Sequence, residues 1–204
     1  MSRCRAMKEE EDLWVFAYGS LMWDPGFSYE DVCAARLFGY HRSFCVLAWT
    51  YRGSREKPGL VLGLDSGGSC VGRAFRVAAE RRDGVVKYLD EREIPDLAQS
   101  IAPIDVYRRK FLNIQLSGTQ SRGEEGTRPK AVALCYVAES RHAQYAGKLR
   151  LEEQARYIVQ GVGTRGTSVD YLENTVDHLD QLGIDDGPLH KLRKQVRLKI
   201  AAAD

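Results

Sequence analysis

Charged side chains crowd the stretch YLDERE, from Tyr88 to Glu93, and place carboxylates at the end of an expected helix. A carboxylate at a helix C-terminus opposes the helix dipole, which costs roughly 0.3–1 kcal/mol at an exposed site. The same field favours the neutral acid and moves the carboxyl pKa toward neutrality, where general acid–base catalysis is most effective. Asp90 and Glu93 share a helix face, whereas Glu91 points elsewhere. A solvated helix end explains the same residues, and composition alone favours it; only the dipole argument points to catalysis.

A second candidate is the interrupted apolar run VFAYGSLMWDPGF, from Val15 to Phe27. The apolar residues stop at Gly19 and Ser20 and then resume. Because a surface turn would be polar on its far side, this pattern predicts backbone that is held inside the protein, against something that it contacts. Glycine has no Cβ, so a ligand can approach the main chain closely, and Ser20 adds a hydroxyl group.

A third candidate is Arg52, at the end of the aromatic stretch WTYRG. Its guanidinium group is a planar fork of donors that matches a carboxylate. An arginine at the edge of the core is the structural alternative, and the residue pattern does not decide between the two.

Other catalytic motifs are missing or lack their structural context. GVGTRG, from Gly161 to Gly166, has the glycine spacing of a dinucleotide-binding loop, but that loop needs a strand before it. A helix is expected there instead, so we predict a helix–helix connection that leads to a helix N-terminus near Ser168. The sequence has no G-x-S-x-G motif, no histidine assignable to a nucleophilic cysteine and no histidine pair with zinc spacing. We therefore expect no metal and no cofactor.

The elements that must position these residues are strands in the first two-thirds of the chain. The expected strands, rich in Val, Leu and aromatic residues, are Leu13–Tyr18, Phe44–Trp49, Leu60–Leu64, Cys70–Val77, Val106–Leu116 and Ala131–Ala138. LDSGGSC, from Leu64 to Cys70, predicts a hairpin between two of them. Few helix-sized patterns separate the strands, so we expect an α+β fold on a small, mostly antiparallel, closed or half-closed β-barrel with flanking helices.

Helices are expected at one point among the strands and over the last third of the chain. The first lies within Val77–Glu93 and cannot pass Pro95. The others follow from apolar residues at helical spacing in Leu151–Gly161, Ser168–Gly183 and Gly187–Ile200.

The totals are those of one ordinary domain: 204 residues, 44% hydrophobic, with a net charge of +2. Near-balanced charge gives no argument for nucleic acid or a membrane surface, and no apolar stretch is long enough to span a bilayer. Met1–Asp12 lacks the apolar core of a secretory signal, so we expect a mobile tail followed by a single domain over 13–204. An odd number of cysteines, five, without C-x-x-C spacing indicates a reducing, cytoplasmic setting.

Taken together, FAYGSLMWDPGF, YRGSREKPGLVLGLDSGGSCVGRAFRV and YLDERE resemble, in this order, the ChaC family of γ-glutamylcyclotransferases. The resemblance covers about Leu13 to Lys199. Enzymes of this family cleave glutathione to 5-oxoproline and cysteinylglycine, on a small β-barrel with flanking helices. The stretch after the YLDERE motif is longer than the family pattern, an insertion over 94–105 whose role the sequence does not give.

The resemblance also implies roles for individual residues. Glu93 closes the family's Y-L-x-x-R-E pattern and takes the place of its catalytic glutamate. The loop that binds the γ-glutamyl group through main-chain atoms consists of Tyr18, Gly19, Ser20 and Leu21. The side chains of Arg52 and Tyr171 complete the substrate site.

The implied reaction is attack of the substrate's α-amine on its own γ-carbonyl, with glutathione as the small-molecule partner. A cyclotransferase for other γ-glutamyl peptides or amines is one alternative, and a non-catalytic γ-glutamyl-binding regulatory protein is another. Retention of Glu93 argues against a pure binding protein, which gains nothing from a carboxylate that opposes the helix dipole. The oligomeric state is not predicted.

Overall fold

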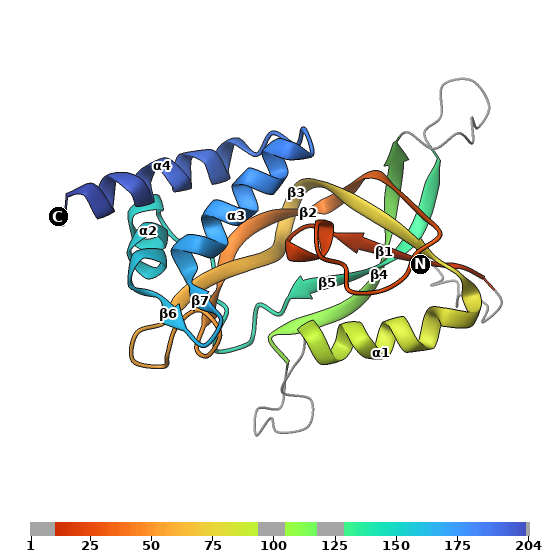
Figure 1. The fold of residues 1–204 in the computed structure, drawn as a ribbon, viewed down its shortest axis with the longest axis horizontal. Coiled ribbons are helices and arrows are strands. Elements are labelled where there is room, and N and C mark those ends of the chain that lie inside the picture. The colour runs from red at the N-terminus through yellow and green to blue at the C-terminus, as the bar shows by residue number, and fades with distance from the viewer. Residues whose placement is uncertain (1–10, 94–104, 118–128, 203–204) are drawn as a thin grey trace.

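In the computed structural model, which describes residues 11–93, 105–117 and 129–202, five strands close into a barrel (Figure 1). The strands are β1 (Leu13–Ala17), β2 (Asp31–Ala48), β3 (Gly59–Val77), β4 (Tyr107–Ser117) and β5 (Lys130–Ala138). Their order is β1-β3-β2-β4-β5; neighbours pair antiparallel, except that β1 and β5 pair in parallel and close the barrel. The expected fold class is confirmed.

The two central strands are much longer than the sequence predicted. Only the end of β2 was expected, and the two strands predicted on either side of the glycine-rich stretch are one continuous strand, β3. The predicted hairpin at Leu64–Cys70 is therefore wrong. Gly67 and Gly68 take positive φ angles of 95° and 69°, and the pairing with β2 shifts register between Phe38 and Tyr40. Glycine permits such angles, so the chain forms a bulge there instead of reversing.

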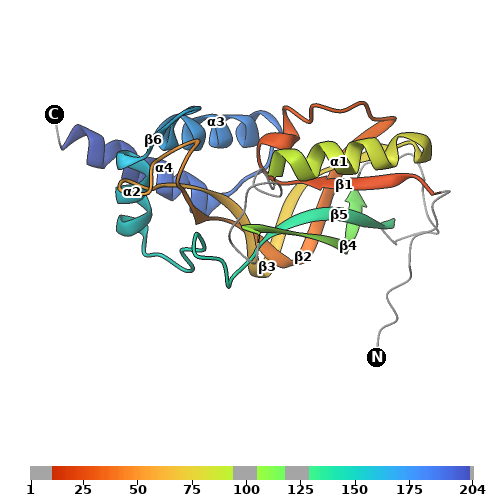
Figure 2. The same cartoon turned by 90° about the horizontal axis from the view of Figure 1, so that it is seen from below.

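The helix that carries the YLDERE stretch is α1 (Arg82–Glu93), which follows a 3-10 turn, η2 (Ala79–Arg81). It buries Val85 and Leu89 and lies along the barrel beside β1 (Figure 2). Residues 94–104 of the expected insertion lie outside the described residues.

Helices α2 (Leu151–Gln160), α3 (Ser168–Gln181) and α4 (Gly187–Ala201) pack on one another, and α2 and α3 also contact β3, at the end of the molecule opposite α1 (Figure 1). All three were expected. The GVGTRG stretch forms a two-stranded ribbon, β6 (Val162–Gly163) and β7 (Gly166–Thr167), between α2 and α3, which confirms a helix–helix connection. Thr167 caps α3 by accepting a hydrogen bond from the Asp170 amide.

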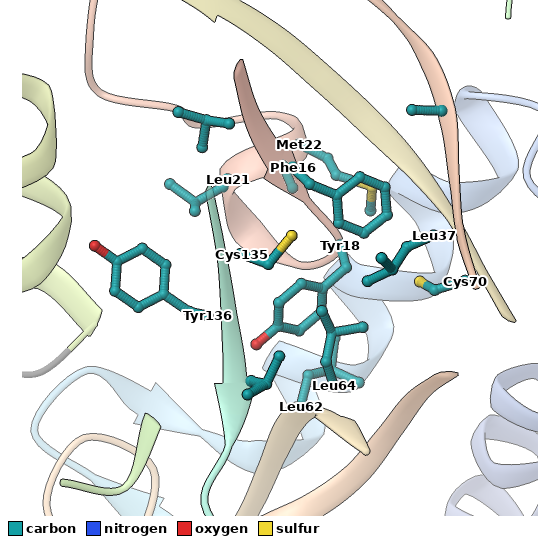
Figure 3. Packing of buried hydrophobic residues seen from close by; sticks show 14 of the residues in the cluster. Phe16, Tyr18, Leu21, Met22, Leu37, Leu62, Leu64, Cys70, Cys135 and Tyr136 are labelled. Carbon is teal, nitrogen blue, oxygen red and sulfur yellow. The ribbon is translucent and has the colours of Figure 1, made fainter. Parts of the chain in front are cut away.

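Buried apolar side chains fill the barrel and continue beneath the helices. The largest fully buried ones are Phe16, Phe44, Phe75, Leu13, Met22, Leu37, Leu60, Leu64, Leu89, Ile114, Leu134 and Ile158. Figure 3 shows part of this cluster, including Phe16, Tyr18 and Met22 with Leu62 and Leu64 of β3.

The start of the chain and the cysteines bear on two further expectations. Residues 1–10 of the expected tail lie outside the described residues, whereas Asp12 pairs with Arg76 at 2.7 Å. The cysteines that the structure describes, Cys33, Cys45, Cys70 and Cys135, are free. Among the described residues, no helix has both the length and the apolar character needed to span a membrane.

Candidate active site

A pocket lies where the end of β1, the end of α1 and the first turn of α3 come together. Its lining residues are Phe16, Tyr18, Gly19, Ser20, Leu21, Leu62, Glu93, Tyr107, Tyr136 and Tyr171. Six of the seven candidate site residues from the sequence are in this set, and Arg52 is not. Residues more than 150 positions apart in the chain thus meet at one place, as the Tyr18 and Tyr171 positions show.

The loop on the β1 side of the pocket is a 3-10 turn, η1 (Ser20–Met22). Leu21 and Met22 are buried, and the Trp23 ring stacks on His178 of α3 with ring centroids 4.4 Å apart. Within the described part of the chain, the amides of Ser20 and Leu21 donate to no protein acceptor. The apolar side chains therefore fix the loop while main-chain donors stay open at the pocket.

Two buried or half-buried arginines bind carbonyl groups of this loop. The Arg42 Nε donates to the Tyr18 carbonyl, and the Arg73 Nη1 donates to the Met22 carbonyl at 2.7 Å. Sequence reasoning missed both, because the partners lie 24 and 51 residues apart and no local pattern links them. Their effect is to fix the peptide planes of the loop before any ligand binds.

A third arginine, Arg92, joins the loop to the end of α1. It donates to the Asp24 carbonyl at 2.8 Å, to the Ser20 hydroxyl oxygen at 3.1 Å and to the Tyr88 hydroxyl oxygen at 3.0 Å. Because the Ser20 oxygen accepts this bond, its own proton stays available to a ligand. Arg92 also lies 3.6 Å from the Glu93 carboxylate, so one guanidinium group links the loop and the carboxylate.

Glu93, the last residue of α1, is largely sheltered, with 19% of its side chain exposed. Burial raises the pKa of its carboxyl group, and the neighbouring Arg92 guanidinium acts in the opposite direction. The sequence argument expected a raised pKa from the helix dipole; the cause that the structure gives is desolvation. A carboxyl group with a raised pKa can both accept and return a proton near neutral pH.

Asp90, which shares a helix face with Glu93, has its oxygens occupied. The Tyr136 hydroxyl donates to Oδ1 at 2.7 Å and the Arg109 Nη1 donates to Oδ2 at 2.7 Å. Asp90 therefore orients Tyr136, which lines the pocket, and is poorly placed to act as a base itself. Glu91 is exposed.

Four tyrosine rings surround the pocket, and two of them, Tyr107 and Tyr136, were not among the candidates. Burial is the main cause that raises the phenol pKa of all four, and the Glu93 charge raises it further. They are consequently neutral hydroxyl groups in the physiological range. Tyr107 and Tyr136 lie in β4 and β5 and gave no sequence signal, because alternation shows that a residue points inward but not that it lies at the pocket.

The tyrosine hydroxyls differ in what they offer a ligand. The Tyr107 hydroxyl donates to the Leu62 carbonyl at 2.6 Å, so its oxygen faces the pocket as an acceptor. The Tyr171 hydroxyl lies at the pocket beside Gly19, where it can donate to a ligand. The Tyr18 hydroxyl is buried, and the structure gives it no protein partner in the described ranges.

Arg52 lies behind Tyr171, with its guanidinium carbon 5.5 Å from the ring centroid. The Arg52 Nη1 donates to the Thr167 carbonyl at 3.1 Å, and the Arg52 carbonyl accepts from the Ser168 hydroxyl at 2.9 Å. No carboxylate pairs with this guanidinium group among the residues that the structure describes, so its remaining donors are available.

Among the described side chains, no three of the types His, Cys, Asp and Glu gather closely enough to hold a metal ion.

Comparison with known proteins adds independent findings. A family model described as ChaC-like protein matches residues 13–199. The chain is 28% identical, over 193 residues, to a glutathione-specific gamma-glutamylcyclotransferase of Escherichia coli, covering 95% of this chain and 76% of the relative. It is 30% identical, over 192 residues, to gamma-glutamylcyclotransferase 2-3 of Arabidopsis thaliana, covering 91% of this chain and 88% of the relative.

A solved structure shares the fold. The crystal structure of a yeast gamma-glutamylcyclotransferase specific to glutathione superposes with a TM-score of 0.77 at 19% identity. The match covers 91% of this chain and 96% of the yeast chain.

Proposed function

The chain belongs to the ChaC-like family, and we propose that it is a γ-glutamylcyclotransferase that cleaves glutathione to 5-oxoproline and cysteinylglycine. The glutathione-specific relatives support this substrate. The observation that carries the proposal is the position of Glu93, a sheltered carboxylate with a raised pKa in the same pocket as the open amides of the loop at Ser20 and Leu21.

The first chemical step uses Glu93 as a general base. The substrate's α-ammonium group gives a proton to the carboxylate, and the free amine then attacks the γ-carbonyl carbon. A carbon–nitrogen bond forms and closes a five-membered ring. The nucleophile is already tethered, and well-oriented intramolecular reactions reach effective molarities of about 10⁵–10⁸ M, so no covalent enzyme intermediate is required.

The second step breaks the original amide bond. The tetrahedral centre collapses, the bond to the cysteine nitrogen breaks, and Glu93 returns its proton to that nitrogen. The ring nitrogen gives its second proton to the departing amine, so cysteinylglycine leaves as an ammonium ion and the neutral lactam of 5-oxoproline remains. One carboxyl group thus takes the ammonium proton and returns it to the leaving nitrogen, which contributes on the order of 10²–10⁴ to the rate.

The loop stabilises negative charge on the substrate. Its open amides at Ser20 and Leu21 and the Ser20 hydroxyl face the pocket, and a fixed donor costs no reorganisation when charge develops on the γ-carbonyl oxygen. A Cβ on Gly19 would stand 3.5 Å from both the Leu62 side chain and the Tyr171 hydroxyl, which is ordinary contact distance, so its cost would be the pocket space that it takes from the substrate.

Arg52 supplies positive charge beside Tyr171. With donors left over after its bond to the Thr167 carbonyl, its guanidinium group suits a carboxylate of the substrate. Tyr107 and Tyr136 add neutral hydroxyl groups around the γ-glutamyl portion.

The direct test is to incubate the purified protein with glutathione and measure 5-oxoproline. Formation of 5-oxoproline and cysteinylglycine in equal amounts, lost in Glu93→Gln, is the expected result. Binding of glutathione without 5-oxoproline would instead indicate a regulatory binding protein. Turnover of other γ-glutamyl compounds in preference to glutathione would indicate the broader cyclotransferase.

We also propose that the enzyme works in the cytoplasm without a cofactor. Free thiols at Cys45, Cys70 and Cys135, all buried, suit a reducing compartment. Activity at full rate in the presence of a chelator and an unchanged melting temperature with reductant are expected; loss of either on treatment argues against this setting.

A further inference from the structure

Arg42 is a buried arginine that connects three parts of the molecule. Its side chain is 2% exposed. Its Nε donates to the Tyr18 carbonyl, one Nη donates to the Val71 carbonyl of β3 at 2.8 Å, and the other donates to Asp186 at 2.8 Å. Met22 Sδ lies 3.8 Å from the same guanidinium group. An arginine on β2 therefore reaches the pocket loop, the barrel wall and the beginning of α4.

Asp186 serves two partners at once. It is the N-cap residue of α4, where Oδ1 accepts from the Leu189 amide, and its Oδ2 accepts from Arg42. Its side chain is 14% exposed. A guanidinium group taken out of water is destabilising unless a partner neutralises it, so Asp186 keeps Arg42 in place.

The hydrogen bond from Arg42 to the Tyr18 carbonyl also sets the direction of the next amide, the Gly19 N–H. The Tyr18 carbonyl and the Gly19 N–H belong to one planar trans peptide unit, so the two groups point in opposite directions. Arg42 holds the carbonyl on one side. The N–H then points away from Arg42, and the described residues offer it no acceptor. Gly19 lines the pocket.

We propose that Arg42, held by Asp186, is a positioning residue that aims the Gly19 N–H into the pocket as a donor to the substrate. The assignment of that donor to a γ-glutamyl substrate rests on the proposed function. The positively charged Arg42 guanidinium beside the Tyr18 carbonyl oxygen also polarises the peptide unit and strengthens the Gly19 N–H as a donor. The C-terminal helices contribute to the site in this way without touching the substrate.

Asp186→Asn separates the two roles of Asp186. Asparagine is as good an N-cap as aspartate, so α4 keeps its capping acceptor, but the charge that holds Arg42 is lost. Asp177→Asn is the matched control, because it removes another ion pair between α3 and α4, the 2.8 Å contact of Asp177 with Arg193, without touching Arg42. Arg42→Ala is less informative, since it leaves Asp186 without its partner.

Two readouts are measured on Asp186→Asn, Asp177→Asn and the unmodified protein. The first is kcat/KM for glutathione, which should fall by about tenfold in Asp186→Asn. Loss of a whole fixed donor costs about 10²–10³, and a donor that is only less well oriented costs less. The second is the amide resonance of Gly19 in ¹⁵N-labelled protein without substrate, which should shift only in Asp186→Asn. Melting temperatures show that both variants are folded.

The proposal requires both changes, and the absence of either one in folded Asp186→Asn overturns it. A fall of equal size in Asp177→Asn also overturns it, because the effect would then belong to helix packing. If the unmodified protein forms no 5-oxoproline, the proposed function fails separately, and the Gly19 resonance alone decides whether Arg42 and Asp186 position that amide.

Discussion

The loop after β1 and the end of α1 form two walls of one pocket, and they are held in different ways. Three arginines, Arg42, Arg73 and Arg92, bond to carbonyl groups of the loop. Among the described residues, the Glu93 carboxylate has one charged neighbour, Arg92 at 3.6 Å, and burial is the main cause of its raised pKa. The loop is fixed by hydrogen bonds, whereas the pKa of Glu93 is raised by burial away from water.

This difference matches what each wall has to do. Main-chain donors stabilise charge best when they are already oriented, because no reorganisation is then needed during the reaction. A group that accepts and returns a proton needs a pKa near the working pH, and too many strong partners would keep a carboxylate ionised. The loop is therefore expected to govern substrate fit, and Glu93 the chemical step.

The largest expected effect comes from removing the proton acceptor. Glu93→Gln keeps the size of the side chain and one oxygen, but it cannot take the ammonium proton. We expect kcat to fall by about 10²–10⁴ with little change in the Kd for glutathione. Steady-state kinetics and calorimetric binding measure the two quantities.

Glu91→Gln is the matched control for this variant, since Glu91 is exposed on the same helix end. It should keep full activity. A Glu93→Gln protein that forms 5-oxoproline at the normal rate would remove Glu93 from the mechanism and would end the distinction between the two walls.

A smaller effect is expected at Arg52, which lies outside the pocket lining. Arg52→Ala should raise KM by about tenfold, because a carboxylate of the substrate loses its partner, with a smaller change in kcat. Arg52→Lys should restore little, since lysine cannot reproduce the planar fork. Unchanged kinetics in both variants would assign Arg52 a purely structural role beside Tyr171.

A still smaller effect is expected from Asp90→Asn. The asparagine can accept from the Tyr136 hydroxyl or from Arg109 but no longer carries the charge that strengthens both bonds. We expect kcat/KM to fall by about threefold while Glu93→Gln remains far more damaging. A loss as large as that of Glu93→Gln would mean that Asp90 takes part in proton transfer.

The smallest effect concerns stability. A carboxyl group whose pKa is raised by folding contributes stability at low pH, and this contribution is lost as the pH rises through the folded-state pKa. Glu93→Gln should therefore raise the melting temperature by about 2 °C at neutral and higher pH, and the difference from the unmodified protein should disappear in acid. Melting curves over a pH series measure this, and a uniform difference at every pH would contradict it.

Local patterns were sufficient for much of the fold. The apolar spacing in Ser168–Gly183 and Gly187–Ile200 correctly gave α3 and α4, because helix faces are set by residues three and four apart. The first half of β2 and the continuity of β3 could not be read in this way. The glycines at 67 and 68 have the signature of a turn, and only the pairing of β3 with β2 shows that they form a bulge.

The residues of the candidate site also differ in whether a local sequence pattern could identify them. Glu93 and the loop from Tyr18 to Leu21 stand out in the sequence because each breaks a local rule. Arg42 does not, since its partners at Tyr18 and Asp186 are brought to it only by folding. Contacts of this kind depend on the whole barrel, and a sequence pattern holds no trace of them.

The most direct measurement is a ¹³C NMR titration of the Glu93 side-chain carboxyl in the free protein, identified by its absence in Glu93→Gln and compared with the pH profile of kcat/KM. We predict that Glu93 titrates above the ordinary range of a glutamate, and that activity falls with the same midpoint as the pH drops and the base becomes protonated. An ordinary or lowered pKa for Glu93, or an activity profile that does not follow its titration, would contradict the account.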